Sequence, residues 1–172
     1  YYNTVKDKIV ALPTMYVWKM MNMGEVDIKG VDVNLSTQFR LPLRMSLLLA
    51  STYSFQYAVD VTDPEAKNYK DQIPYTPRNS GTVSVTLENP WVNVSYILTA
   101  VGDRYALPQN IDRNRIDSYI EQSISINRDF RFRYFGLRLQ GELLNLANVN
   151  YDVIQYYPMP GRSWRLSICL SY

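Results

Sequence analysis

The sequence RSWRLSICLSY, residues 162–172, decides the fold class. Large apolar or aromatic side chains occupy every second position from Trp164 to Tyr172, and polar or small side chains lie between them. Because successive side chains of a β-strand point to opposite faces of the sheet, this period of two predicts a strand with one apolar and one polar face. The pattern continues to the last residue, whereas chain ends usually fray unless they are held. We therefore expect this segment to be the terminal strand of a sheet.

The same alternation recurs along the chain and predicts eight strands in all. One of them, at residues 45–61, is far longer than the usual strand of about 5 to 6 residues. Within residues 24–41 the apolar parity changes at Gly30, which predicts a β-bulge there, because one extra residue flips all the side chains that follow. The predicted strands are residues 1–12, 24–41, 45–61, 81–87, 91–105, 116–127, 132–146 and 162–172.

The predicted connections alternate strictly between short and long. Tight turns are expected near Pro42, Asn89 and residues 128–130. The long connections are residues 13–23, 62–77, 106–115 and 147–161, of which the first is expected to be a hydrophobic loop or strand extension. Outer-membrane barrels combine short periplasmic turns with long extracellular loops, and about 9 to 11 alternating residues cross the hydrocarbon layer. The sequence thus predicts an all-β fold, a transmembrane antiparallel up-and-down β-barrel.

Composition excludes several classes of function. The net charge of +2 does not favour a nucleic-acid-binding surface, and the absence of histidine removes the commonest general base and transition-metal ligand. We expect no catalytic residue, no metal site and no cofactor. No apolar run is long enough for a transmembrane helix, and the first residues lack the core of a signal peptide. Cys169 is expected to pack as a small residue in the last strand.

A soluble sandwich or barrel is the alternative fold, since alternation alone does not show which face of the sheet contacts water. Three features favour the membrane barrel instead. The strands are too long for a compact sandwich, the aromatic rings gather near the strand ends as in an interfacial girdle, and the opposite face carries many charged and amide side chains.

Two motifs resemble a known family. The elements Asn145-Leu146-Ala147-Asn148 with Tyr151, and Pro158-Met159-Pro160-Gly161-Arg162 before the terminal strand, are similar to the C-terminus of TonB-dependent outer-membrane receptors of the cobalamin and iron-chelate type. Residues 3–30 are similar to a segment from the middle of such a barrel. The resemblance implies a barrel of about 22 strands filled by a plug domain. Residues 1–172 would be its last eight strands, without the plug.

The resemblance also implies a function. Such receptors lie in the outer membrane of Gram-negative bacteria and transport a scarce nutrient, here a ferric siderophore, cobalamin or a haem-like complex. The expected partners are the plug and N-terminal strands of the same receptor, TonB acting through that plug, the barrel-assembly machinery and the lipid bilayer, with a surface lipoprotein as a further candidate. No nucleic-acid partner is expected.

Candidate site residues fall into two groups. Aromatic side chains on exposed loops favour ligand binding, although an outer aromatic girdle or packing on neighbouring loops is the competing interpretation. These candidates are Tyr16, Trp18, Tyr69, Tyr75, Tyr105, Tyr156 and Tyr157. The barrel-assembly signal implied by the family comprises Trp164, Leu166, Ile168, Leu170 and Tyr172.

Charged residues suggest weaker sites. The polar-face arginines Arg40, Arg138 and Arg165 are expected to pair with Asp32, Asp117 or Glu142, with contact to the plug as the alternative. The acidic residues Asp60, Asp63 and Glu65 offer oxygen ligands for calcium, but they form no defined loop motif and are better interpreted as a solvated cluster.

A self-contained eight-stranded barrel with an adhesin or structural role is the alternative function, because eight strands can close. Such a barrel must pair its first strand with its last. Residues 1–12 form a poor lipid-facing strand, since Asp7 lies on the apolar parity between Lys6 and Lys8. Pairing of the first strand therefore distinguishes the two hypotheses.

Overall fold

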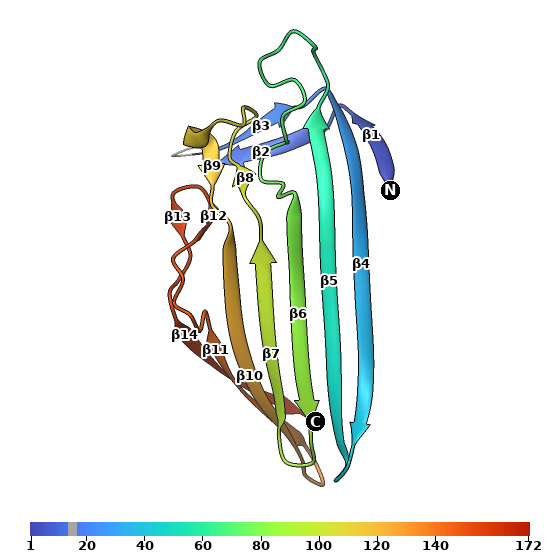
Figure 1. Ribbon diagram of the computed structural model, residues 1–172. Helices are drawn as coiled ribbons and strands as arrows, with labels where there is room; N and C mark the ends of the chain where they lie inside the picture. Colours follow the sequence, from blue (N-terminus) through green and yellow to red (C-terminus); the bar gives the residue numbers. More distant parts are fainter. Residues whose placement is uncertain (14–16) are drawn as a thin grey trace.

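The computed structural model describes residues 1–13 and 17–172 and contains one large antiparallel sheet of eight strands (Figure 1). Neighbours in the sheet follow the order β1-β4-β5-β6-β7-β10-β11-β14, so each strand pairs with the next large strand of the chain. The bounds are β1 Tyr2–Lys6, β4 Glu25–Leu41, β5 Met45–Asp60, β6 Asn79–Glu88, β7 Asn93–Val101, β10 Tyr119–Arg131, β11 Gly136–Leu144 and β14 Ser163–Ser171. The expected antiparallel meander of eight strands is confirmed.

Smaller elements gather at the end of the sheet that carries the long connections. They are three two-stranded pairs, β2 (Ile9–Pro13) with β3 (Trp18–Asn22), β8 (Arg104–Tyr105) with β9 (Arg115–Ile116), and β12 (Asp152–Ile154) with β13 (Tyr157–Pro158). A short 3₁₀ helix, η1, spans Asp112–Asn114. Within the described ranges, no helix is both long and apolar enough to cross a membrane. The segment expected to be a hydrophobic loop or strand extension, residues 13–23, contributes Pro13 and β3 to the β2–β3 hairpin.

The strand register places the apolar side chains on one face of the sheet and the polar ones on the other. One row of residues paired across the sheet is Phe39, Leu47, Leu87, Val94, Ile126, Gly141 and Leu166. The neighbouring row, on the opposite face, is Gln38, Leu48, Thr86, Ser95, Ser125, Glu142 and Arg165. The two faces are therefore continuous across neighbouring strands, as the sequence alternation predicts.

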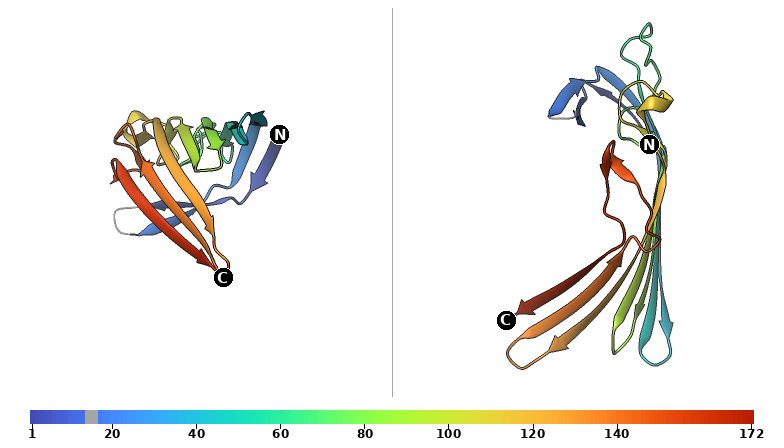
Figure 2. Two further views of the ribbon diagram at one scale, coloured as in Figure 1. Left: turned by 90° about the horizontal axis from the view of Figure 1, so that it is seen from below. Right: turned by 90° about the vertical axis from the view of Figure 1, so that its left-hand side faces the viewer.

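The predicted bulge at Gly30 is wrong. Strand β4 pairs with β5 without a shift of register from Val26–Asp60 to Leu41–Met45. The apolar parity changes because Val26 and Ile28 pack beneath the β2–β3 hairpin, whereas the apolar residues after Gly30 face the other way. Figure 2 shows that this hairpin lies on the concave side of the sheet. The polar face is therefore the concave face, and the apolar face is convex.

The tight turn predicted at residues 128–130 is also misplaced. Strand β10 continues to Arg131, and the chain reverses over residues 132–135 before β11 begins. The Phe132 backbone N–H donates to the Phe135 carbonyl at 2.9 Å, and the two rings stack with centroids 4.6 Å apart. Apart from Arg133, the turn is built from aromatic residues and contains none of the small polar residues, glycine or proline that usually signal a turn.

Strands β1 and β14 are the two edges of the sheet, and in the described chain they do not pair with each other. The views in Figure 2 show an open, curved sheet whose edges remain apart. The eight strands therefore do not close into a barrel of their own. Both edges leave backbone hydrogen-bonding groups for strands outside this sheet.

Candidate ligand-binding surface

A small hydrophobic core joins the β2–β3 hairpin to the long loop of residues 61–78. Met23, Val26, Ala58 and Ile73 are each at most 3% exposed, and Val10, Met21 and Ile28 pack against them. Val26 and Ala58 come from the sheet, while Met23 precedes β4 and Ile73 lies in the loop. Burial of these side chains fixes two of the long connections against the sheet.

Gln72 holds the 61–78 loop along the upper part of β5. Its side chain is 2% exposed, its Nε2 donates to the carbonyls of Gln56 and Thr76, and its Oε1 accepts from the Ala58 N–H at 3.3 Å. The Ile73 N–H also donates to the Ala58 carbonyl at 2.9 Å. The loop thereby continues the pairing of β5 beyond the end of β6.

The Asp60 carboxylate accepts hydrogen bonds from residues of the loop that follows β5. It is 7% exposed, and one oxygen accepts from the Thr62 N–H and hydroxyl while the other accepts from Asn68 at 2.8 Å. Asp63 accepts from the Glu65 N–H at 3.0 Å. Among the described residues no group of three or more acidic, histidine or cysteine side chains could hold a metal ion. Asp60 is thus a buried hydrogen-bond acceptor and not part of a solvated cluster.

Arg104 links two further loops. Its side chain is 4% exposed, and Nη2 donates to the backbone carbonyls of Asp152 at 2.5 Å and Val153 at 3.2 Å. The guanidinium also lies 5.5 Å from the ring centre of Tyr119, which stacks on Tyr151 at 4.1 Å. Burial lowers the pKa of Arg104, but a guanidinium remains charged at neutral pH. Loops 102–118 and 145–162 are therefore held together by one cation.

Three more contacts connect the loops. The Tyr75 N–H donates to the Tyr105 carbonyl at 2.7 Å, and the Asn110 N–H donates to the Asp71 carboxylate at 3.0 Å, which joins loop 61–78 to loop 102–118. Gln155 donates to the Arg113 carbonyl at 3.2 Å. Burial raises the pKa of the Tyr75 hydroxyl, while the Gln155 backbone and the charge of Arg104 act in the opposite direction. The long loops thus form one connected surface.

The motif residues Asn145, Asn148 and Arg162 close the base of the last long loop. Asn145 is 3% exposed, donates to the carbonyls of Val149 and Pro160, and accepts from the Val149 N–H at 2.9 Å. Asn148 accepts from the Arg162 N–H at 2.8 Å, and the Arg162 guanidinium donates to the Leu146 carbonyl at 2.6 and 3.0 Å. A Cβ at Gly161 would lie 2.7 Å from Asn148 Oδ1, so a larger residue there would displace the acceptor of the Arg162 N–H. The two sequence motifs therefore form a single clasp.

The predicted loop aromatics separate into exposed and partly buried groups. Trp18, Tyr156 and Tyr157 are 58%, 77% and 54% exposed, and the last two lie together around β13. Tyr69, Tyr75 and Tyr105 are partly buried. Tyr75 and Tyr105 are brought together by their backbone hydrogen bond, whereas Tyr16 lies outside the described residues.

The terminal strand has the expected alternation. Trp164, Leu166, Ile168 and Leu170 lie on the convex face, paired with Leu143, Gly141, Leu139 and Leu137 of β11. Their exposed fractions are 64% to 78%. Cys169 lies in the last strand but does not pack as expected, because it is exposed on the opposite, polar face.

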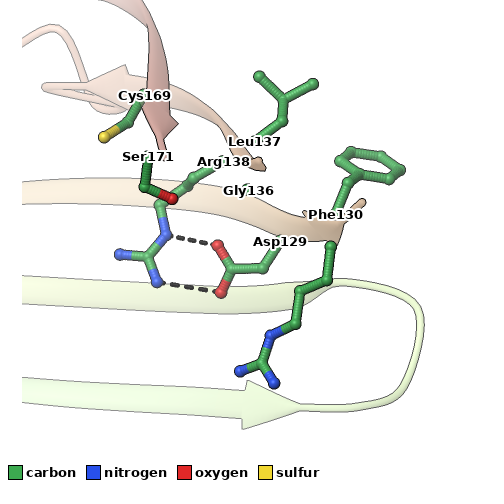
Figure 3. A pocket seen from close by; sticks show the side chains of 8 residues that line it. Asp129, Phe130, Gly136, Leu137, Arg138, Cys169 and Ser171 are labelled. Carbon is green, nitrogen blue, oxygen red and sulfur yellow. Dashed lines mark hydrogen bonds and ion pairs between the residues drawn. The ribbon is translucent and has the colours of Figure 1, made fainter. Parts of the chain in front are cut away.

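A shallow hollow of about 250 Å³ lies at the short-turn end, on the polar face of β10, β11 and β14 (Figure 3). Arg138 binds the Asp129 carboxylate with two hydrogen bonds of 2.6 and 3.0 Å. Asp129 is not one of the partners predicted for Arg138, and it was missed because a turn was expected there. Arg165 does pair with Glu142, and Asp117 pairs with Arg115 at 3.4 Å.

Sequence reasoning did not single out Arg104 or Gln72 as loop-linking residues. A lone arginine or glutamine beside a polar loop carries no pattern that distinguishes it from a solvated side chain. Their roles depend on contacts with residues 48 positions along the chain for Arg104 and 14 positions for Gln72. Only the three-dimensional arrangement brings these partners together.

A curved antiparallel wall with one apolar face, short turns at one end and linked loops at the other is the architecture of an outer-membrane barrel. The chain belongs to the TonB dependent receptor-like β-barrel family, whose model matches residues 1–146. The terminal strand β14 and the clasp residues Asn148 and Arg162 lie outside that match.

A solved structure with a similar fold is BauA, the ferric preacinetobactin receptor of Acinetobacter baumannii, with a TM-score of 0.71 and 13% sequence identity. The likeness covers 99% of this chain and 26% of BauA, so the chain spans about a quarter of the length of that receptor. At this identity the likeness concerns the fold alone. A comparison with curated proteins found no match.

Proposed function

We propose that this chain forms part of the barrel wall and outer loops of an outer-membrane TonB-dependent receptor that transports a scarce nutrient complex in a Gram-negative bacterium. The observation that carries the proposal is the asymmetry of the sheet. A convex apolar face suits a bilayer, a concave polar face suits a filled lumen, and the linked loops lie at one end only. Transport of this kind breaks no covalent bond, so the protein is not an enzyme.

The loop end is proposed as the outer, ligand-binding side. Ferric siderophores, cobalamin and haem-like complexes are large and carry flat or conjugated groups, which exposed aromatic rings contact well. Trp18, Tyr156 and Tyr157 present such rings. The partly buried Tyr69, Tyr75 and Tyr105 support the shape of the surface. The family match and the fold shared with a ferric siderophore receptor favour an iron chelate among these ligands.

The proposed partners follow from the surfaces that the sheet leaves open. The edges of β1 and β14 suit pairing with the remaining strands of the same receptor, and the concave face suits a plug domain through which TonB acts. The aromatic and apolar side chains of β14 are proposed to be read by the barrel-assembly machinery. A surface lipoprotein that docks on the loop end is a further candidate.

Ligand binding tests the proposal directly. The complete receptor that contains this chain is purified in detergent and titrated with ferric siderophores, cobalamin and haem, and binding is measured by calorimetry. Replacement of both Tyr156 and Tyr157 by Ala is expected to weaken binding of the true ligand at least tenfold, about 1.4 kcal/mol. The control is the same change at Phe132 and Tyr134, which are exposed at the short-turn end.

Two results would contradict the proposal. If none of the three ligand classes binds the complete receptor, the nutrient assignment is wrong. If the short-turn variant weakens binding as much as the loop variant, the ligand-binding side is wrongly assigned.

A further inference from the structure

Aromatic and cationic side chains alternate in a row on the convex face, near the loop end. Tyr2 of β1 pairs with Lys29 of β4, and Lys29 pairs with Tyr57 of β5. Arg78 lies just before β6, where its carbonyl accepts from the Gln56 N–H. The Lys29 ammonium lies 5.3 Å from the Tyr2 ring centre, and the Arg78 guanidinium lies 5.2 Å from the Tyr57 ring centre. Both rings belong to the convex face, and each cation lies over one of them, although the Arg78 backbone is opposite Gln56 of the concave row.

The two cations keep their charge available to an outside partner. In the described chain, neither Lys29 nor Arg78 forms an ion pair with a carboxylate. Asp27, two residues before Lys29 on the same face, accepts from Thr4 at 2.8 Å and from Tyr2 at 3.4 Å. Asp103 lines a hollow together with Arg78, but its carboxylate pairs with Arg115 at 3.1 Å. Both cationic side chains are exposed.

A hollow of about 600 Å³ lies beside this row, toward the apolar belt. One register row contains Tyr53, Gly81, Ala100 and Ile120, so two of the smallest residues stand between two large ones. Tyr53 and Ile120 are 46% and 50% exposed and form the walls of the hollow. Asn79, Gly102 and Ser118 form its polar end. The row of Lys29 and Tyr57 lies four residues along β5 from Tyr53, about 13 Å away.

We infer that a membrane lipid with an anionic phosphate headgroup docks here, with its phosphate between Lys29 and Arg78 and an acyl chain over Gly81 and Ala100. The inference rests on the proposed function, because it requires the convex face to lie in a bilayer. The charge of the row complements a phosphate, and the hollow lies where hydrocarbon would meet the wall. A lipid occupant satisfies both features at once, whereas a soluble anion would use only the cations.

The test uses the complete receptor in detergent and counts retained lipids by native mass spectrometry. Phosphatidylglycerol is the anionic probe and phosphatidylcholine is the zwitterionic one. The double variant Lys29→Gln and Arg78→Gln is expected to lose affinity for phosphatidylglycerol by about 25-fold, since each cation near an anionic surface contributes about fivefold. Affinity for phosphatidylcholine is expected to stay nearly unchanged.

Two control variants show whether the position of the lost charges and the face of the added side chain matter for lipid binding. Lys67→Gln with Arg113→Gln removes the same charge from exposed loop sites and is expected to change neither affinity. Ala100→Leu fills the hollow and is expected to lower retention of both lipids. Ala50→Leu makes the same change on the concave face, opposite Ser36 and Ser84, and is expected to have no effect.

Equal binding of both lipids by the unmodified receptor, or equal losses in the two charge variants, would overturn the inference. Insertion into neutral phosphatidylcholine vesicles is measured in parallel. A receptor that inserts but shows no preference for anionic lipid refutes only the lipid site. A receptor that fails to insert refutes the membrane placement on which the proposed function depends.

Discussion

The two ends of the sheet differ in how deeply their apolar side chains are buried. At the loop end the structure has a core of the kind found in soluble proteins, which includes Val26, Ala58, Ile73, Ala106 and Ile116, each at most 4% exposed. At the short-turn end, none of the described residues of the turns or the adjoining strand halves is buried. Large apolar side chains such as Leu43, Trp91 and Tyr134 are 61% to 80% exposed there.

This difference indicates where each half obtains its stability. The loop end is stabilised by its own packing and by buried hydrogen bonds. The rest of the wall is a single layer, so its apolar face gains stability only when lipid covers it. The stability lost on mutation at the loop end should therefore be similar in detergent and in lipid, whereas the loss on the apolar face of the wall should depend on the lipid.

The largest effect is expected for Val26→Asp. Val26 is fully buried under the hairpin, and a carboxylate there would have no partner, so the loop end should be destabilised by about 4 kcal/mol. The loss should appear in detergent and in lipid alike, measured as faster proteolysis of residues 9–22 and 61–78. Asn34→Asp, on the exposed polar face of the same strand, is the control. Equal proteolysis of the two variants would contradict the existence of this core.

A somewhat smaller effect is expected for Leu35→Arg on the convex face. Leu35 is 66% exposed and lies in the middle part of β4, so an arginine there should cost about 2 to 4 kcal/mol in a bilayer. The free energy of folding into vesicles of the complete receptor measures this effect. Ser36→Arg, one residue along on the polar face, should cost much less. If Ser36→Arg is the more harmful variant, the two faces have been assigned the wrong way round.

Arg104→Gln should have a moderate and local effect. The change removes the donor of two hydrogen bonds to the partly buried Asp152 and Val153 carbonyls, a loss of about 1 to 3 kcal/mol. Hydrogen exchange is expected to accelerate in residues 145–162 while the sheet stays protected. Arg113→Gln, an exposed site in the same loop, provides the control. Unchanged exchange in the Arg104 variant would show that the loops are joined mainly by other contacts.

The smallest effect is expected for Asp129→Asn at the short-turn end. Asp129 and its partner Arg138 are 46% and 57% exposed, and water weakens the attraction of exposed ion pairs. The melting temperature of the complete receptor should stay within experimental error of the unmodified protein. A clear decrease would indicate that the pair is covered by another part of the receptor.

The sequence pattern predicted the wall well and the loop end poorly. Period-two alternation arises wherever the two faces of a strand have constant and different surroundings, which holds for β10 and β14. It misleads where the surroundings change along one strand. At Gly30 the hairpin covers the concave face before the residue and leaves it open afterwards, and the resulting parity switch looks like a bulge.

Other errors have similar causes. The β2–β3 hairpin has apolar residues on both faces, so it shows no alternation and was expected to be a loop or strand extension. Asp129 lies in a strand although the polar residues Asn127 and Arg128 precede it, while the actual turn is largely aromatic. The clasp of Asn145, Asn148 and Arg162 was noticed as a motif, but the hydrogen bonds that join its two halves link residues 14 to 16 positions apart and required the structure.

The links among the long loops also limit how such a surface can change during evolution. A loop that stands alone can gain or lose residues with little effect on its neighbours. Here Arg104 binds the backbone of Asp152 and Val153, and Asn110 binds Asp71, so a change of length in one loop moves an anchor of another. New ligand specificity is therefore expected to arise through substitution of exposed side chains such as Tyr156 and Tyr157, with the lengths of the loops changing together.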